Sequence, residues 1–184
     1  MLRPEEKKLE YVKQKLSECR TLYNQLNYLE TLAKEDMDIS TKKFVYIQLV
    51  ELYTAKGMFD KAARAMKGKA SLNSLFRELV EDFGKAGELY IKAGKIDEGK
   101  EMFARALKES NTQQAADLRL TMKNVLFSQA KELEAKHRTS AAVKFYEETL
   151  RIPTLNEMEK EEVKNKLRGT YKSLGMFREL KMLG

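Results

Sequence analysis

The side chains of this sequence with the clearest chemical potential are basic, and they gather in one short stretch. Lys61, Arg64 and Lys67 recur every three residues, so on a helix they share one face. Lys56 and Lys69 flank them, and Asp60 is the acidic residue among them. Because mobile cations of this kind contact phosphates, the sequence predicts an anion-binding site formed by Lys56, Lys61, Arg64, Lys67 and Lys69. No exposed aromatic residue for base stacking is expected beside these cations, so nucleic acid would be held through its backbone and released by salt.

Catalytic and metal-binding patterns are weak by comparison. The single cysteine, Cys19, lies on an apolar stripe and is interpreted as a small core residue. The single histidine, His137, occupies a turn position, and histidine is enriched at positive φ. The sequence contains no Gly-x-Gly-x-x-Gly or Walker motif, and one Cys with one His cannot complete the usual four-ligand zinc site. We therefore predict no enzymatic activity, no cofactor and no metal site.

The composition favours a helical protein from a reducing compartment. The chain has 184 residues, of which 42% are hydrophobic and 34% are charged, with two prolines and no tryptophan. No apolar run reaches the length of about 18 residues that a membrane span needs, and the charged N-terminus does not resemble a secretory signal. A cytoplasmic protein without membrane insertion is predicted. The net charge of +7 fits either a solvated basic surface or an anionic partner.

The first element is predicted to be one long helix over residues 4–35. Pro4 is tolerated in a first helical turn, and apolar residues follow at alternating spacings of three and four. This stripe contains Leu9, Val12, Leu16, Cys19, Tyr23 and Leu26.

The remaining chain repeats one helix–turn–helix pattern. A turn residue recurs at Gly57, Gly94, His137 and Gly175. A tyrosine stands four residues before the turn in three copies, at Tyr53, Tyr90 and Tyr171. Glycine is the residue that most easily adopts the left-handed conformation at a helix C-terminus.

Residues 41–184 resemble the tetratricopeptide repeat family, most strongly around residues 83–107. The resemblance implies that Gly87 lets two antiparallel helices approach, that Gly94 forms the turn, and that Tyr90, Phe103 and Ala106 pack between helices. The spacing of the copies is longer than the family's period of about 34 residues. The fold class predicted is an all-α, antiparallel helical-hairpin solenoid of about four hairpins with a long N-terminal helix, as a single domain over 1–184.

The same resemblance implies a non-catalytic protein–protein interaction scaffold or adaptor whose partner is unidentified. In this family the first helix of each pair lines a concave groove. Mapped onto this sequence, that groove predicts partner-binding residues at Phe44, Ile47, Glu51, Glu81, Glu88, Ile91, Phe127 and Lys131. The N-terminal helix filling the groove is an equal alternative.

Two further hypotheses concern partners. An RNA- or ribosome-associated factor would use the basic stretch at 56–69. The last helix carries apolar residues that no further repeat covers, and solenoid ends usually need a polar cap. A homodimer through this helix would involve Phe177, Leu180, Met182 and Leu183.

Overall fold

The computed structural model describes residues 3–183, and every regular element among them is a helix. The order is η1 (Pro4–Lys7), α1 (Leu9–Glu18), α2 (Leu22–Leu32), α3 (Ile39–Ala55), α4 (Phe59–Ala70), α5 (Phe76–Lys92), α6 (Ile96–Lys108), α7 (Thr112–Ala135), α8 (Thr139–Leu150), α9 (Glu157–Leu174) and α10 (Phe177–Met182). The chain divides into two compact units between Ser110 and Asn111. The all-α, helical-hairpin fold class is confirmed, whereas a single folding domain stays a prediction.

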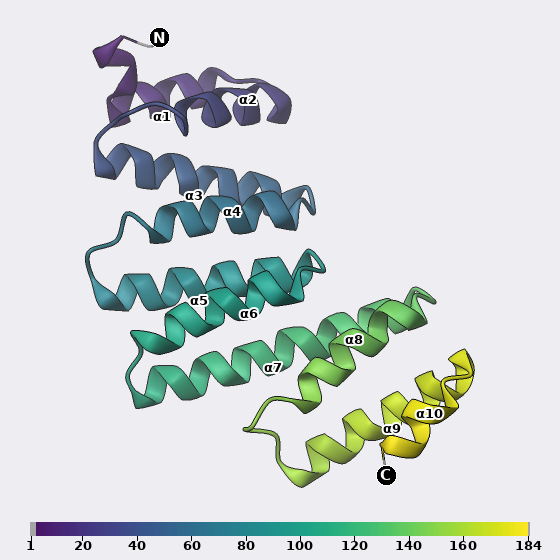
Figure 1. Cartoon of the computed structure of the whole chain (residues 1–184). Coiled ribbons are helices and arrows are strands. Elements are labelled where there is room, and N and C mark those ends of the chain that lie inside the picture. Colours follow the sequence, from purple (N-terminus) through teal and green to yellow (C-terminus); the bar gives the residue numbers. More distant parts are fainter. Residues whose placement is uncertain (1–2, 184) are drawn as a thin grey trace. The chain divides into compact units, whose positions relative to one another are not determined.

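The first unit stacks antiparallel hairpins in chain order. Figure 1 shows α3 and α4 as one pair and α5 and α6 as the next, with α4 packed on α5 and α2 packed on α3. Its core consists mainly of small and aliphatic side chains that allow close helix packing, together with buried phenylalanine and tyrosine rings. Fully or almost fully buried members include Leu29, Leu32, Val45, Ala62, Leu89, Ile91, Met102 and Phe103.

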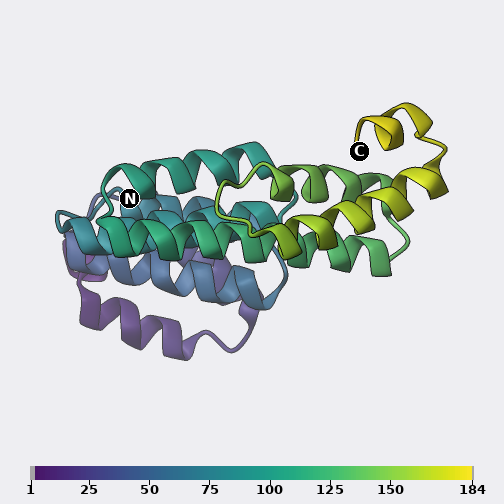
Figure 2. The ribbon, with the colours of Figure 1, turned by 90° about the horizontal axis from the view of Figure 1, so that it is seen from below.

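The second unit repeats this arrangement with α7 and α8, followed by α9 and α10. Helix α8 packs against both α7 and α9, and Figure 2 shows the short α10 turning back at the end of α9. The core of this unit is built around Tyr146, which is fully buried, together with Leu126, Ala130, Ala142 and Leu167.

All four predicted turn residues adopt the left-handed conformation. The φ angles are 69° at Gly57, 82° at Gly94, 68° at Gly175 and 56° at His137. The amide after each turn residue bonds back to a carbonyl five positions earlier, as in a Schellman motif. These bonds are 2.8–2.9 Å long and join Met58 to Tyr53, Lys95 to Tyr90, Arg138 to Leu133 and Met176 to Tyr171. The repeat register read from the sequence is confirmed.

The close approach expected at Gly87 is also present. A β-carbon added at Gly87 would lie 2.7 Å from the Phe103 ring and 3.1 Å from the Gly99 carbonyl oxygen. Gly99 is equally confined, because a β-carbon there would lie 2.6 Å from Ile91. These two glycines let α5 and α6 meet backbone to backbone.

The prediction of one long helix over 4–35 is wrong. Helix α1 ends at Glu18, and Cys19 has an extended ψ of 102°. Thr21 then caps a new helix, since its hydroxyl oxygen accepts a hydrogen bond from the Asn24 amide at 3.2 Å. The Gln25 side-chain amide donates to the Cys19 carbonyl at 3.2 Å, which gives this carbonyl at the end of α1 a hydrogen-bond partner. Local capping therefore overrides an apolar spacing that would allow a continuous helix.

Candidate interaction surfaces

The predicted groove residues on α3 lie at or near the surface. Phe44 is half-buried, Ile47 is 37% exposed, and Glu51 is exposed. The Gln48 side-chain amide donates to Glu51 at 2.9 Å. The α3 side of the predicted groove therefore combines two apolar contacts with a carboxylate that already has a hydrogen-bond partner.

The carboxylates predicted on α5 are paired along their own helix. Arg77 donates to Glu81 at 3.0 Å, and Lys85 donates to Glu88 at 2.9 Å. The Arg77–Glu81 pair lies largely in solvent, where ion pairs contribute little to stability, whereas Glu88 is half-buried. The acidic face expected from the sequence is thus balanced by local cations.

Ile91 is wrong as a groove residue. Its side chain is fully buried, and it faces Gly99 of α6 within the contact made possible by the two glycines. The close approach of α6 covers this side of α5, so Ile91 belongs to the core.

In the second unit, helices α7 and α9 form a small cavity, here called the α7–α9 groove. It has a volume of about 90 Å³ and is lined by Lys123, Asn124, Phe127, Thr149, Leu155, Glu159, Glu162 and Val163. Lys123 pairs with Glu159, and Lys131 pairs with Glu162 at 3.5 Å, so ion pairs join the two helices. Lys131 also lies 4.3 Å from the centroid of the Phe127 ring, within the range of a cation–π contact.

Phe127 is held in position by the buried ring of Tyr146. Its ring packs edge-on against Tyr146 with centroids 5.8 Å apart. The Tyr146 hydroxyl donates to Glu134 at 2.9 Å, and Lys166 of α9 donates to the same carboxylate oxygen at 3.0 Å. Burial, together with this hydrogen bond, raises the pKa of Tyr146, so the hydroxyl remains a neutral donor. The groove therefore has a rigid apolar wall.

Sequence analysis identified Phe127 in the groove and Lys131 beside it but missed Lys123, Thr149, Leu155, Glu159 and Val163. Leu155 lies in the α8–α9 connection and is buried, and Val163 is buried on α9. Helical spacing along α7 gave no information about a residue supplied by a loop. Lys123 of α7 donates a hydrogen bond to Glu159 of α9, a contact between two helices that spacing along one helix does not reveal.

The basic stretch is only partly available to an anion. Lys69 is wrong as a free cation, because its ammonium group donates to both oxygens of buried Asp82 at 2.7 and 2.6 Å. Arg64 pairs with Asp60 at 3.0 Å and Lys61 with Glu30 at 3.3 Å. Neither Lys56 nor Lys67 forms an ion pair within residues 3–183.

The apolar residues of the last helix are unevenly covered. Phe177 is 70% exposed and Met182 is 78% exposed, whereas Leu180 and Leu183 are half-buried. Helix α10 packs on α9. A homodimer through these residues stays a prediction.

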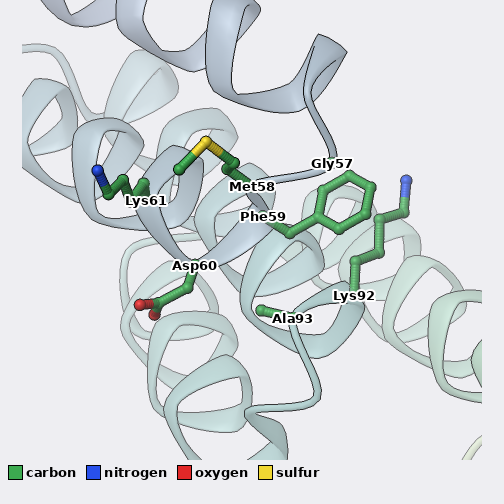
Figure 3. Close-up of a pocket in the computed structure, with 7 residues that line it drawn as sticks. All are labelled: Gly57, Met58, Phe59, Asp60, Lys61, Lys92 and Ala93. Carbon is green, nitrogen blue, oxygen red and sulfur yellow. The ribbon is translucent and has the colours of Figure 1, made fainter. Parts of the chain in front are cut away.

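A further depression lies at the turn between α3 and α4, here called the turn pocket (Figure 3). It has a volume of about 390 Å³ and is lined by Gly57, Met58, Phe59, Asp60, Lys61, Lys92 and Ala93. In Figure 3 Met58 and Lys61 extend to one side of the turn, while the Phe59 ring and Lys92 lie on the other. The pocket combines apolar surface with two lysines and contains no nucleophile beside a base.

The part of the chain that the structure describes contains neither a metal-binding cluster nor a helix suited to span a membrane. No group of three or more His, Cys, Asp or Glu side chains is placed to hold a metal ion in residues 3–183. Within the same residues, no helix has both the length and the apolar character that crossing a membrane requires.

Comparison with known proteins gives structural matches of low sequence identity. No protein-family model and no curated protein matches the chain. BtubC (BKLC) from P. vanneervenii aligns with 94% of this chain and 74% of its own at 17% identity, with a TM-score of 0.40. A kinesin light chain-like protein of nearly identical TPR-like repeats from Podosopora anserina aligns with 100% of this chain and 93% of its own at 14% identity, also with a TM-score of 0.40. A single-substitution variant of the latter aligns with 95% of this chain and 88% of its own, at 14% identity and the same TM-score.

Proposed function

We propose that this chain is a non-catalytic interaction scaffold that binds a segment of a partner protein in the α7–α9 groove. One observation carries the proposal: Phe127 lines an apolar cavity that is bordered by charged side chains of both signs from two helices. An apolar centre with a polar rim is the usual anatomy of a protein interface.

The size and chemistry of the groove indicate how a partner would bind. A cavity of about 90 Å³ accepts one apolar side chain rather than a whole small-molecule substrate. Asn124, Lys131 and Glu162 are exposed at its border and can bond to the partner's backbone or charged groups. The groove holds no nucleophile with an adjacent base, which supports a binding role. The reducing cytoplasm is the proposed compartment, because the single cysteine, Cys19, is free.

Two exposed positions allow the groove to be altered while the core is kept. Asn124→Arg places a long side chain at the mouth of the cavity, and Lys131→Glu reverses the charge beside Phe127. Lys144→Glu on α8 is the matched control, because Lys144 is exposed and lies outside the groove lining. Partners captured by the full-length chain from nuclease-treated lysate would be purified and titrated against each variant, with circular dichroism to verify folding.

We expect Asn124→Arg and Lys131→Glu each to raise the Kd of a purified partner about tenfold or more, which corresponds to a loss of about 1.4 kcal/mol of binding free energy. Lys144→Glu should leave this Kd unchanged. Equal binding by wild-type and groove variants would refute the groove as the site. Loss of every partner on nuclease treatment would instead assign the function to the basic stretch at 56–69.

A further inference from the structure

A second cavity lies in the first unit, between α2, α3 and α4, and is here called the α2–α4 cleft. It has a volume of about 280 Å³ and is lined by Glu30, Ala33, Lys34, Tyr46, Leu49, Tyr53, Lys61, Arg64 and Ala65. Helix α3 supplies the floor, and α2 and α4 supply the two walls. The cleft is larger than the α7–α9 groove and shares no residue with it.

The floor of the cleft is apolar and fixed. Leu49 is 3% exposed and Tyr53 is 5% exposed, so only their edges reach the cavity. Tyr46 is half-buried, and its ring packs on Gly68 of α4 so closely that an added β-carbon would lie 2.8 Å from it. This floor is suited to an apolar side chain, and burying such a side chain supplies the driving force for binding.

The rim of the cleft has a surplus of positive charge. Lys34, Lys61 and Arg64 surround it, and Glu30 is the carboxylate in its lining. Glu30 is already engaged, because it accepts hydrogen bonds from the Tyr53 hydroxyl and, at 3.3 Å, from Lys61. The Tyr53 hydrogen bond, and then Lys61, hold the pKa of Glu30 below its usual range, so it is ionised at neutral pH. Lys34 forms no ion pair in the described part of the chain, and Arg64 remains two-thirds exposed beside Asp60.

The positive surface continues beyond the cleft. Lys61 lines both the α2–α4 cleft and the turn pocket of Figure 3, so the two depressions are adjacent. The turn pocket adds Met58, which is 37% exposed, and Lys92, which forms no ion pair in the described part of the chain. An extended ligand leaving the cleft past Lys61 would therefore meet a further apolar contact and a further cation.

We propose that the α2–α4 cleft binds an acidic peptide segment that places one apolar side chain on the Tyr46–Leu49 floor and its carboxylates beside Lys34, Lys61 and Arg64. This is a second interaction surface, independent of the α7–α9 groove. Nucleic acid fits less well, because the Tyr53 ring is buried and Lys61 covers its face at 5.4 Å, so Tyr53 offers no platform for a base.

The proposal can be tested by fluorescence anisotropy on the full chain. The probe is a short fluorescein-labelled peptide with a central leucine flanked by glutamates on both sides. Comparison peptides replace the leucine with serine or the glutamates with glutamine. The protein variants are Lys34→Glu and Arg64→Glu, both at exposed positions. Lys108→Glu on α6 is the matched control, since it makes the same charge change in the same unit outside both pockets.

We expect each rim variant to weaken binding of the leucine peptide about tenfold at low salt, and Lys108→Glu to leave it within about twofold. Both comparison peptides should also bind about tenfold more weakly. If the serine peptide bound as tightly as the leucine peptide, or if Lys108→Glu lost as much affinity as the rim variants, the binding would be general electrostatic attraction. Either result would overturn the proposal. Displacement of the peptide by single-stranded oligouridine, with the same rim dependence, would overturn it in favour of nucleic acid. Asn124→Arg should bind the peptide normally, so failure of this proposal and failure of the groove proposal are distinguishable.

Discussion

At the scale of single residues, the α5–α6 contact depends on two positions that tolerate no β-carbon. Gly87 and Gly99 place each backbone within van der Waals reach of the other, and Phe103 and Ile91 fill the space beside them. A methyl group at Gly87 must displace an almost fully buried ring or separate the helices. The interior is densely packed, so neither adjustment is free of cost.

We therefore expect Gly87→Ala to lower the free energy of unfolding. Overpacking typically costs about 1–3 kcal/mol, which exceeds the gain of about 0.5–1 kcal/mol that alanine brings to a helix. Gly169→Ala on α9 is the matched control, because nothing lies within 4 Å of its added β-carbon, and it should stabilise. Urea denaturation of each variant measures the difference. A Gly87→Ala variant as stable as Gly169→Ala would show that α5 and α6 can accommodate the added β-carbon.

The role of a residue could be predicted from the sequence where the signal is local. It could not be predicted where the residue's partner is distant in the chain. The packing roles of Gly87 and Phe103 follow from the repeat resemblance, and both are found. Lys69 looked like a free cation because its partner, Asp82, is supplied by the next helix. Ile91 looked like a groove residue because helical spacing does not reveal which side of α5 is covered by α6.

At the scale of elements, helix ends decide the architecture more than apolar spacing does. The four left-handed turns set the hairpins, and each was recognisable because glycine or histidine recurs there. The break between α1 and α2 was missed, since Thr21 is a cap whose signal is weaker than glycine or proline. Sequence therefore locates the hairpin turns well and capped breaks in an apolar stripe poorly.

The turn at His137 gives a prediction for one such element. A non-glycine residue in the left-handed region costs about 1–2 kcal/mol, so His137→Gly should stabilise by about 0.5–1 kcal/mol after the entropy of glycine is subtracted. For a chain of this size that raises Tm by about 1–4 °C. Lys136→Gly is the control, because its φ of −86° is open to any residue and glycine there only adds chain entropy. A lower Tm for His137→Gly would mean that the imidazole stabilises the turn by contacts of its own.

At the scale of the whole molecule, a substitution can destabilise one hairpin alone or its neighbours as well. Within each unit the helices pack on their neighbours in the chain, and in such arrays stability is close to a sum of repeat and nearest-neighbour contributions. The division at Ser110 and Asn111 separates two sets of neighbours, each with its own core. Sequence patterns detect the repeat but contain no comparable signal for where cooperativity ends.

Hydrogen exchange can measure that limit with the Gly87→Ala variant. We expect faster amide exchange in α3–α6, where the damaged contact and its neighbours lie, and unchanged protection in α8 and α9, whose core around Tyr146 is intact. Gly169→Ala should leave exchange in α3–α6 as it is in the wild-type chain. If Gly87→Ala speeds exchange equally in both units, the chain unfolds as the single domain predicted from sequence. Confinement to the first unit would instead mean that the two proposed binding surfaces belong to units that open independently, so a ligand that protects the α2–α4 cleft would not protect the α7–α9 groove.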